Sequence, residues 1–101
     1  MIGGKKHDEG KLRYDLMPPF AEAEVIRVLT FGADKYGPDN WRLVDQAQQR
    51  YLAAAMRHLA AYRQGSDTRD DESGLHHLAH AACCLLFLIE LGEINESNSY
   101  R

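Results

Sequence analysis

The sequence has little cysteine, no long apolar run and no excess of positive charge, and each shortage excludes a class of protein. Its two cysteines, Cys83 and Cys84, are adjacent, so neither a structural disulfide nor a Cys-x-x-Cys zinc or redox motif is expected. The longest apolar stretch, 78–91, is interrupted by His80 and is too short and too polar to span a membrane. The formal net charge of −3 argues against binding to duplex nucleic acid.

The N-terminal segment also lacks the apolar core of a signal peptide, because residues 1–16 are rich in glycine and charge. Together with the reduced cysteines, this favours a cytoplasmic protein. What the chain does contain is 45% hydrophobic and 27% charged residues within 101 residues. That composition is typical of one folded domain.

Apolar residues recur at helical spacing along most of the chain, which predicts an all-α fold. In the first expected helix, Val25, Ile26 and Leu29 lie on one stripe. We expect a small helical bundle that is completed by oligomerisation, because a chain this short buries only a limited part of its surface. The three main helices are expected at about 19–36, 45–64 and 71–91.

Capping signals support these bounds. Gly37, followed by proline, can end the first helix. Asp45 and Gln48 form a capping-box pattern before the second helix, and Asp70 or Asp71 can cap the third. The chain then divides into a flexible basic arm at 1–17, a single helical domain at 18–94 and a frayed polar tail at 95–101.

Three histidines fall on helix faces that should be buried. His77 and His80 are three residues apart and share a face, while His58 lies within the apolar stripe of the second helix. Such histidines can bind a divalent metal or activate water. The alternative is that they are core histidines bonded to neighbouring carbonyl groups, and the spacing leaves both interpretations open.

Carboxylates that suit a hard cation lie near the starts of the first and third expected helices. Glu22 falls on an apolar stripe, where an unpaired carboxylate is costly, and Glu24 lies nearer the edge of that stripe. Asp70, Asp71 and Glu72 lie near the start of the third helix. The alternative is that the two aspartates act as helix caps and that Glu72 is a solvated first-turn charge, and capping is favoured for each aspartate taken singly. Magnesium and manganese prefer oxygen ligands of this kind and bind phosphates alongside.

A compact group around Gly37 could bind a nucleotide. Lys35 can pair with a phosphate, Tyr36 and Trp41 can stack on a base, and Asn40 can read a base edge. The alternative is a plain helix end, with the lysine on the helix dipole and the tryptophan folded onto the core. The pattern alone leaves these two interpretations equal.

Together, these segments resemble the phage family of dATP/dGTP diphosphohydrolase N-terminal domains, over about residues 8–91. The combination of motifs is more specific than any one of them. The matching stretches are Gly10-Lys11-Leu12-Arg13-Tyr14-Asp15-Leu16 with Pro18, Phe31-Gly32-Ala33-Asp34-Lys35-Tyr36-Gly37 with Asn40-Trp41, Arg57-His58-Leu59, and Glu72-Ser73-Gly74-Leu75 with His77-Leu78-Ala79-His80-Ala81.

The resemblance implies a helical domain akin to the MazG-like all-α nucleoside triphosphate pyrophosphatases, located in the host cytoplasm. It implies a magnesium- or manganese-dependent enzyme that converts a purine deoxynucleoside triphosphate to monophosphate and pyrophosphate. His58 or His77 would then be the base or an orienting group. The metal ligands would be Glu22, Glu24, Glu72 and His80, and the nucleotide would contact Lys11, Arg13, Lys35, Tyr36, Asn40, Trp41 and Arg57.

Two other hypotheses stay open. The chain could bind and sequester a nucleotide without turnover, for example a host defence signal, because the basic and aromatic residues do not need a metal. It could also be a structural helical partner whose core histidines are simply hydrogen-bonded.

Overall fold

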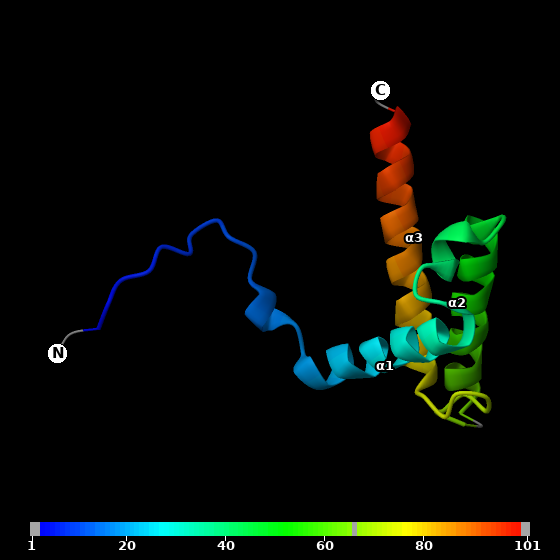
Figure 1. Ribbon diagram of the computed structural model, residues 1–101. Coiled ribbons are helices and arrows are strands. Elements are labelled where there is room, and N and C mark those ends of the chain that lie inside the picture. Colours follow the sequence, from blue (N-terminus) through cyan, green and yellow to red (C-terminus); the bar gives the residue numbers. More distant parts are fainter. Residues whose placement is uncertain (1–2, 66, 100–101) are drawn as a thin grey trace.

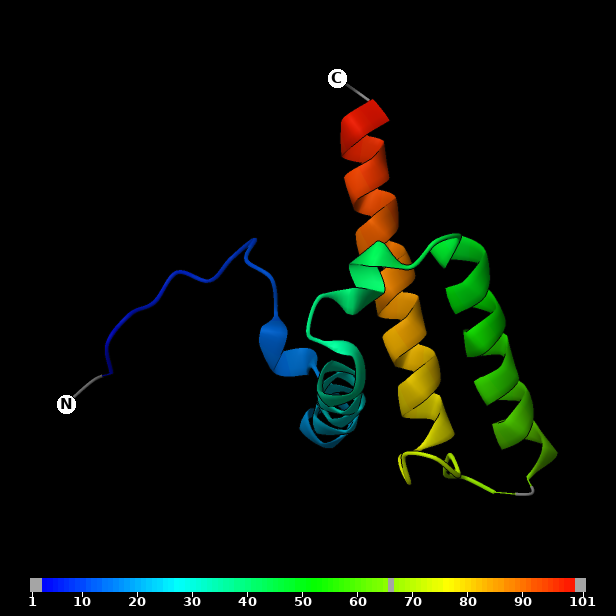
Figure 2. The same cartoon turned by 45° about the vertical axis from the view of Figure 1, so that its right-hand side comes forward.

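The computed structural model describes residues 3–65 and 67–99, and within them it confirms the all-α fold with three main helices. Helices α2 and α3 run antiparallel and side by side with the most extensive contacts, and α1 crosses the N-terminal half of α3 (Figures 1 and 2). The arm extends away from the helices. The elements are η1 (Tyr14–Leu16), α1 (Pro19–Tyr36), η2 (Asn40–Leu43), α2 (Ala47–Gln64) and α3 (His77–Ser99), where η marks a short 3-10 helix.

Helix α1 has the bounds that its local signals predict. Pro19 stands in the first turn, where its missing N–H is no loss. At the other end, Gly37 has a φ of 97° and donates its N–H to the carbonyl of Ala33 at 2.8 Å. A residue with a Cβ is strained at that φ, so glycine followed by proline ends the helix here.

Helix α2 begins differently from the prediction. Gln46, rather than Asp45, precedes its first turn, with a left-handed φ of 52° and no side-chain capping bond. The capping box between Asp45 and Gln48 is therefore wrong. The C-terminal end near Gly65 is as expected, because this glycine also has a left-handed φ, of 73°.

Helix α3 begins at His77, six residues later than expected. Asp70 does cap, but it caps a turn: its Oδ2 accepts the N–H groups of Glu72 at 3.1 Å and Ser73 at 3.0 Å. Gly74 then takes a φ of 72° and donates to the carbonyl of Asp70, which reverses the chain before a helix can start. An isolated bridge between Arg69 and His76 closes this loop.

The C-terminal end of α3 also differs, because the helix continues to Ser99 rather than ending near Leu91. Gly92 is helical and is not among the glycines with positive φ, so it does not act as a cap. Most of the expected frayed tail is therefore helical backbone, and residues 100–101 lie outside the described part.

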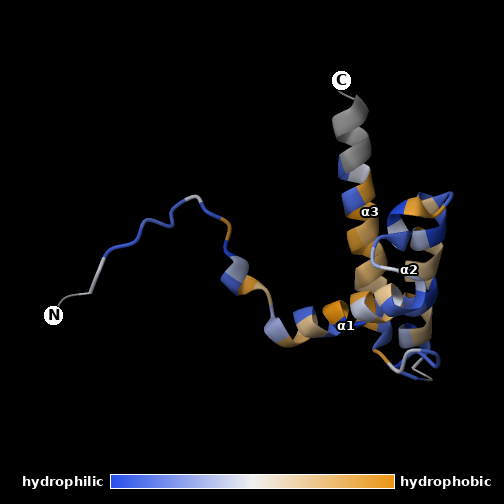
Figure 3. Ribbon diagram, viewed as in Figure 1, coloured by the Kyte–Doolittle hydropathy of each residue, from blue (hydrophilic) through white to orange (hydrophobic). Residues whose placement is uncertain are grey.

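The buried core is small. Val28 of α1 meets Ala79 and Cys83 of α3, with Phe87 and Leu29 packed at the edge. The chain exposes 8315 Å², whereas a compact monomer of 11.4 kDa exposes about 5,800 Å². The extended arm, whose residues are mostly hydrophilic (Figure 3), accounts for part of this difference. Exposed apolar side chains on the helices account for another part. No helix within the described residues is long and apolar enough to cross a membrane.

Candidate functional site

A cleft of about 1050 Å³ opens between the C-terminal half of α1, η2, α2 and α3. Its volume is in the range of small-molecule sites. Its walls combine an apolar floor with a few polar and cationic side chains. The polar and aromatic residues along it are Lys35, Tyr36, Asn40, Trp41, Gln49, Arg50, Tyr51, Arg57, His80 and Phe87.

Aromatic packing holds the η2 side of this cleft. The Trp41 and Phe87 rings stack with centroids 4.4 Å apart and planes 9° apart. The Arg42 guanidinium carbon lies 4.2 Å from the centroid of the Trp41 ring, and the Tyr51 hydroxyl donates to the Trp41 carbonyl at 3.2 Å. Trp41 thus contacts residues of both α2 and α3. Its ring packs on the core and is not free to stack on a nucleotide base.

The end of α1 supplies an exposed aromatic ring and a cation. Tyr36 is 62% exposed, and its ring centroid lies 5.0 Å from the Lys35 ammonium nitrogen. Lys35 also forms an ion pair with Glu72, and this hydrogen bond raises the pKa of Lys35. Asn40 is exposed at the start of η2. Three of the predicted nucleotide contacts thus share one rim of the cleft.

The remaining predicted nucleotide contacts are divided. Arg57 is exposed on α2 and lines the cleft, together with Arg50, which the sequence analysis did not select. Lys11 and Arg13 belong to the arm and do not line the cleft, and Arg13 forms an ion pair with Asp15 at 2.8 Å.

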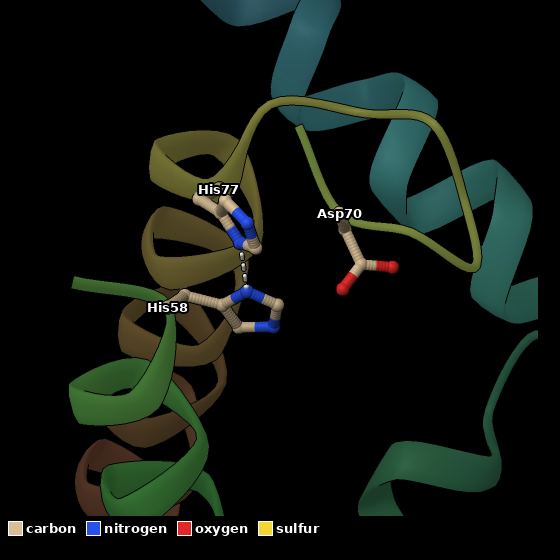
Figure 4. Close-up of side chains that lie close together, drawn as sticks. All are labelled: His58, Asp70 and His77. Carbon is tan, nitrogen blue, oxygen red and sulfur yellow. Dashed lines mark hydrogen bonds between the residues drawn. The ribbon is translucent and has the colours of Figure 1, made fainter. Parts of the chain in front are cut away.

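Beside the cleft, the fold brings together a cluster of polar side chains, the histidine–aspartate cluster, made of His58, Asp70, His77 and His80. The Nδ1 atoms of His58 and His77 are 2.9 Å apart. The His58 and His80 rings stack at 4.5 Å with planes 10° apart. Figure 4 shows His58 from α2, His77 from α3 and Asp70 from the preceding loop around a common space.

The protonation states in the cluster follow from burial and charge. Burial lowers the pKa of His58, and the neighbouring His80 lowers it further. Burial also lowers the pKa of His80, although Asp70 acts in the opposite direction. Burial alone would raise the pKa of Asp70, but the donated N–H groups and the nearby histidines outweigh it and lower this pKa. Near neutral pH, His58 and His80 are therefore neutral and Asp70 is ionised.

Of the four predicted metal ligands, His80 belongs to this cluster, and the three carboxylates lie outside it. Glu22 is exposed rather than buried, Glu24 forms an ion pair with Arg27 at 3.5 Å, and Glu72 pairs with Lys35. Within residues 3–65 and 67–99, the one group of three or more potential ligands whose atoms lie within 4.8 Å of one another is His58, Asp70 and His77. The four residues selected from sequence do not form such a group.

From the sequence alone, capping was favoured over cation binding for Asp70, and Ser73 was not among the predicted site residues. The Ser73 hydroxyl lies 2.6 Å from Nε2 of His80 and also accepts the N–H of Leu75 at 3.1 Å. Gly74 indicates a turn from the sequence alone, but the sequence does not show which side chains that turn faces. The two thiols in the cleft are not nucleophiles, since burial raises the pKa of Cys83 to about 12 and also raises that of Cys84.

The profile of the family described as dATP/dGTP diphosphohydrolase, N-terminal, matches residues 2–100, so the chain belongs to this family. A protein of Salmonella phage PMBT28 named dATP/dGTP diphosphohydrolase is 43% identical over 88 residues, which cover 87% of this chain and 29% of that protein. The chain thus spans less than a third of the length of this relative. No solved structure matches the present chain.

Proposed function

We propose that the chain carries the active site of a metal-dependent pyrophosphohydrolase that converts a purine deoxynucleoside triphosphate to its monophosphate and pyrophosphate. The observation that carries the proposal is the cleft in which Arg57, Lys35 and Tyr36 meet the histidine–aspartate cluster through His80. The name of the phage relative, and the family to which the chain belongs, support the choice of substrate class.

The cleft supplies the contacts that such a substrate needs. Arg57 can bind phosphate oxygens through two parallel hydrogen bonds, and Lys35 can exchange its Glu72 partner for a phosphate. The exposed Tyr36 ring can stack on the purine, and Asn40 can bond to a base edge. Lys11 and Arg13 could reach the phosphates only if the arm folds back over the cleft.

The reaction also needs a divalent cation to neutralise phosphate charge and a group to activate water. Magnesium or manganese is expected from the family resemblance. Magnesium prefers oxygen ligands, of which the cluster offers one carboxylate beside two imidazoles, so the residues present fit manganese better. His80, which lines the cleft and is neutral near pH 7, can accept a proton there.

The test is to incubate the chain with dGTP or dATP and Mn²⁺ and to measure pyrophosphate and the monophosphate. We expect both products from the parent chain and much less from the His80→Gln variant, because glutamine keeps a hydrogen-bonding group but cannot accept the proton. Absence of pyrophosphate with every purine nucleotide would contradict the proposal.

A second candidate function is nucleotide binding without turnover. The scarcity of carboxylates in the cluster favours it, since Arg57, Lys35 and Tyr36 can hold a nucleotide without a metal. Calorimetry with dGTP in the presence of EDTA separates the two candidates. Tight binding with recovery of intact dGTP favours this candidate, whereas binding that requires a metal favours hydrolysis.

We also infer that the chain forms a homo-oligomer. One face of α2 exposes Leu52, Met56 and Leu59, by 48%, 60% and 45%. A stable dimer buries about 800 Å² per partner, and the exposed surface exceeds that of a compact monomer by about 2,500 Å², of which the extended arm contributes one part and the apolar side chains of the helices another. Light scattering should show an oligomer that Leu59→Glu dissociates and that Leu43→Glu, on exposed η2, leaves intact. A monomeric parent chain at tens of micromolar would contradict this inference.

A further inference from the structure

The His58–Asp70–His77 group is formed by three separate segments of the chain. His58 comes from the middle of α2, His77 is the first residue of α3, and Asp70 comes from the loop between these helices. One potential ligand atom from each lies within 4.8 Å of the other two. Nothing in the local sequence requires this meeting, because it depends on how α2 packs against α3.

We propose that His58, Asp70 and His77 bind one first-row transition-metal dication through the two Nδ1 atoms and a carboxylate oxygen. The role of this ion in hydrolysis rests on the proposed function, whereas its binding does not. The site differs from the ligand set expected from sequence, in which Glu22, Glu24 and Glu72 were the oxygen donors.

The geometry of the two imidazoles suits a shared ion. Metal–imidazole bonds are about 2.0–2.1 Å long, so two nitrogens at right angles around one ion lie about 2.9 Å apart. The Nδ1 atoms of His58 and His77 are separated by that distance. Without an ion, the same separation is a hydrogen bond in which one ring donates and the other accepts. One potential ligand atom of Asp70 lies within 4.8 Å of one such atom of each histidine, so a change of its side-chain rotamer would complete the set.

Neighbouring groups orient these ligands. Two backbone N–H groups of the turn bond to Oδ2 of Asp70, which leaves its Oδ1 free for an ion. The His80 ring stacks on His58, and Ser73 holds the far nitrogen of His80. Such outer contacts fix the orientation of metal ligands and typically influence affinity.

The donor set decides which cations fit. Imidazole nitrogens favour transition metals, and one carboxylate is too few oxygen donors to hold Mg²⁺ tightly. Affinity should therefore increase from Mn²⁺ to Co²⁺ and then to Ni²⁺. Three protein ligands leave coordination positions open for water or phosphate oxygens, and His80 places the site next to the cleft.

The test is titration of the chain with Co²⁺, followed by visible absorption and calorimetry in the absence of nucleotide. We expect one Co²⁺ per chain with micromolar affinity, unaffected by a tenfold excess of Mg²⁺. Asp70→Asn and His77→Gln should each weaken binding at least tenfold. The Asp70→Asn substitution keeps an oxygen acceptor for the turn, so this variant should retain the helical circular dichroism of the parent. The control is His7→Gln, which removes an exposed histidine of the arm.

Every outcome of the titration bears on the site. Failure of the parent chain to bind Co²⁺ stoichiometrically overturns the site, as does unchanged affinity in folded Asp70→Asn and His77→Gln. If His7→Gln weakens Co²⁺ binding as much as Asp70→Asn and His77→Gln do, the ion lies on the arm, and this result also overturns the proposed site. Stoichiometric binding without pyrophosphate release from dGTP keeps the metal site and contradicts only the proposed function.

Discussion

The η2 side of the cleft and the histidine–aspartate cluster on its other side, next to the cleft, use their side chains in opposite ways. At η2, Trp41, Phe87 and Tyr51 contact one another, and the hydroxyl of Tyr51 has a backbone partner. At the start of α3, His58 and His77 are bonded to each other through their Nδ1 atoms, and together with Asp70 they surround a common space, where a ligand can replace that bond. Contacts at the first side are satisfied within the chain, whereas those at the second leave capacity for a ligand.

This difference separates stability from binding. Aromatic groups that stack on one another contribute through buried area and ring contacts, and their loss should weaken the fold. Polar groups with unused acceptors contribute less to folding, and their loss should weaken binding. Variants at each place therefore test this difference.

The largest effect is expected from Trp41→Ala, which removes the ring stacked on Phe87. Because this ring is half-buried, we expect a loss of about 2–3 kcal/mol in the free energy of unfolding, measured by urea denaturation. Tyr36→Ala is the control, since this ring is 62% exposed and should contribute little to stability. If the free energy of unfolding of Trp41→Ala decreased only as little as that expected for Tyr36→Ala, Trp41 would not be a packing residue.

A smaller effect is expected from Arg57→Ala, in nucleotide affinity rather than in stability. Hydrogen bonds to charged groups contribute about 1.5–3 kcal/mol, so dGTP affinity should decrease about tenfold or more. The matched control is Arg63→Ala, which removes the same side chain from the same helix but outside the cleft. Calorimetry measures both. Equal affinity of the two variants would remove Arg57 from the nucleotide site.

The smallest effect is expected from Ser73→Ala, which tests how much the polar side contributes to folding. The variant loses the contact to His80 and the bond from the N–H of Leu75, and should lose about 1 kcal/mol of unfolding free energy. Thr30→Ala is a control, because the hydroxyl of Thr30 only bonds back to its own helix. A loss as large as that of Trp41→Ala would contradict the division between the two sides.

Local signals predicted what depends on near neighbours in the chain. Helix α1 ends where Gly37 and Pro38 stand, and α2 ends before Gly65, because a left-handed φ and a missing N–H stop a helix in almost any context. The start of α3 was wrong for a related reason. A capping aspartate looks the same before a helix and before a turn, and the left-handed Gly74 decides between them.

Residue spacing alone therefore predicts the all-α fold, the apolar stripes and the inward faces of His58, His77 and His80, because helical periodicity depends only on spacing. Which polar groups meet depends on the tertiary structure. It left Glu22 exposed, engaged Trp41 with Phe87 and placed Asp70 near His58 and His77. These contacts join residues that are distant in sequence, so they depend on how α1, α2 and α3 pack rather than on any local pattern.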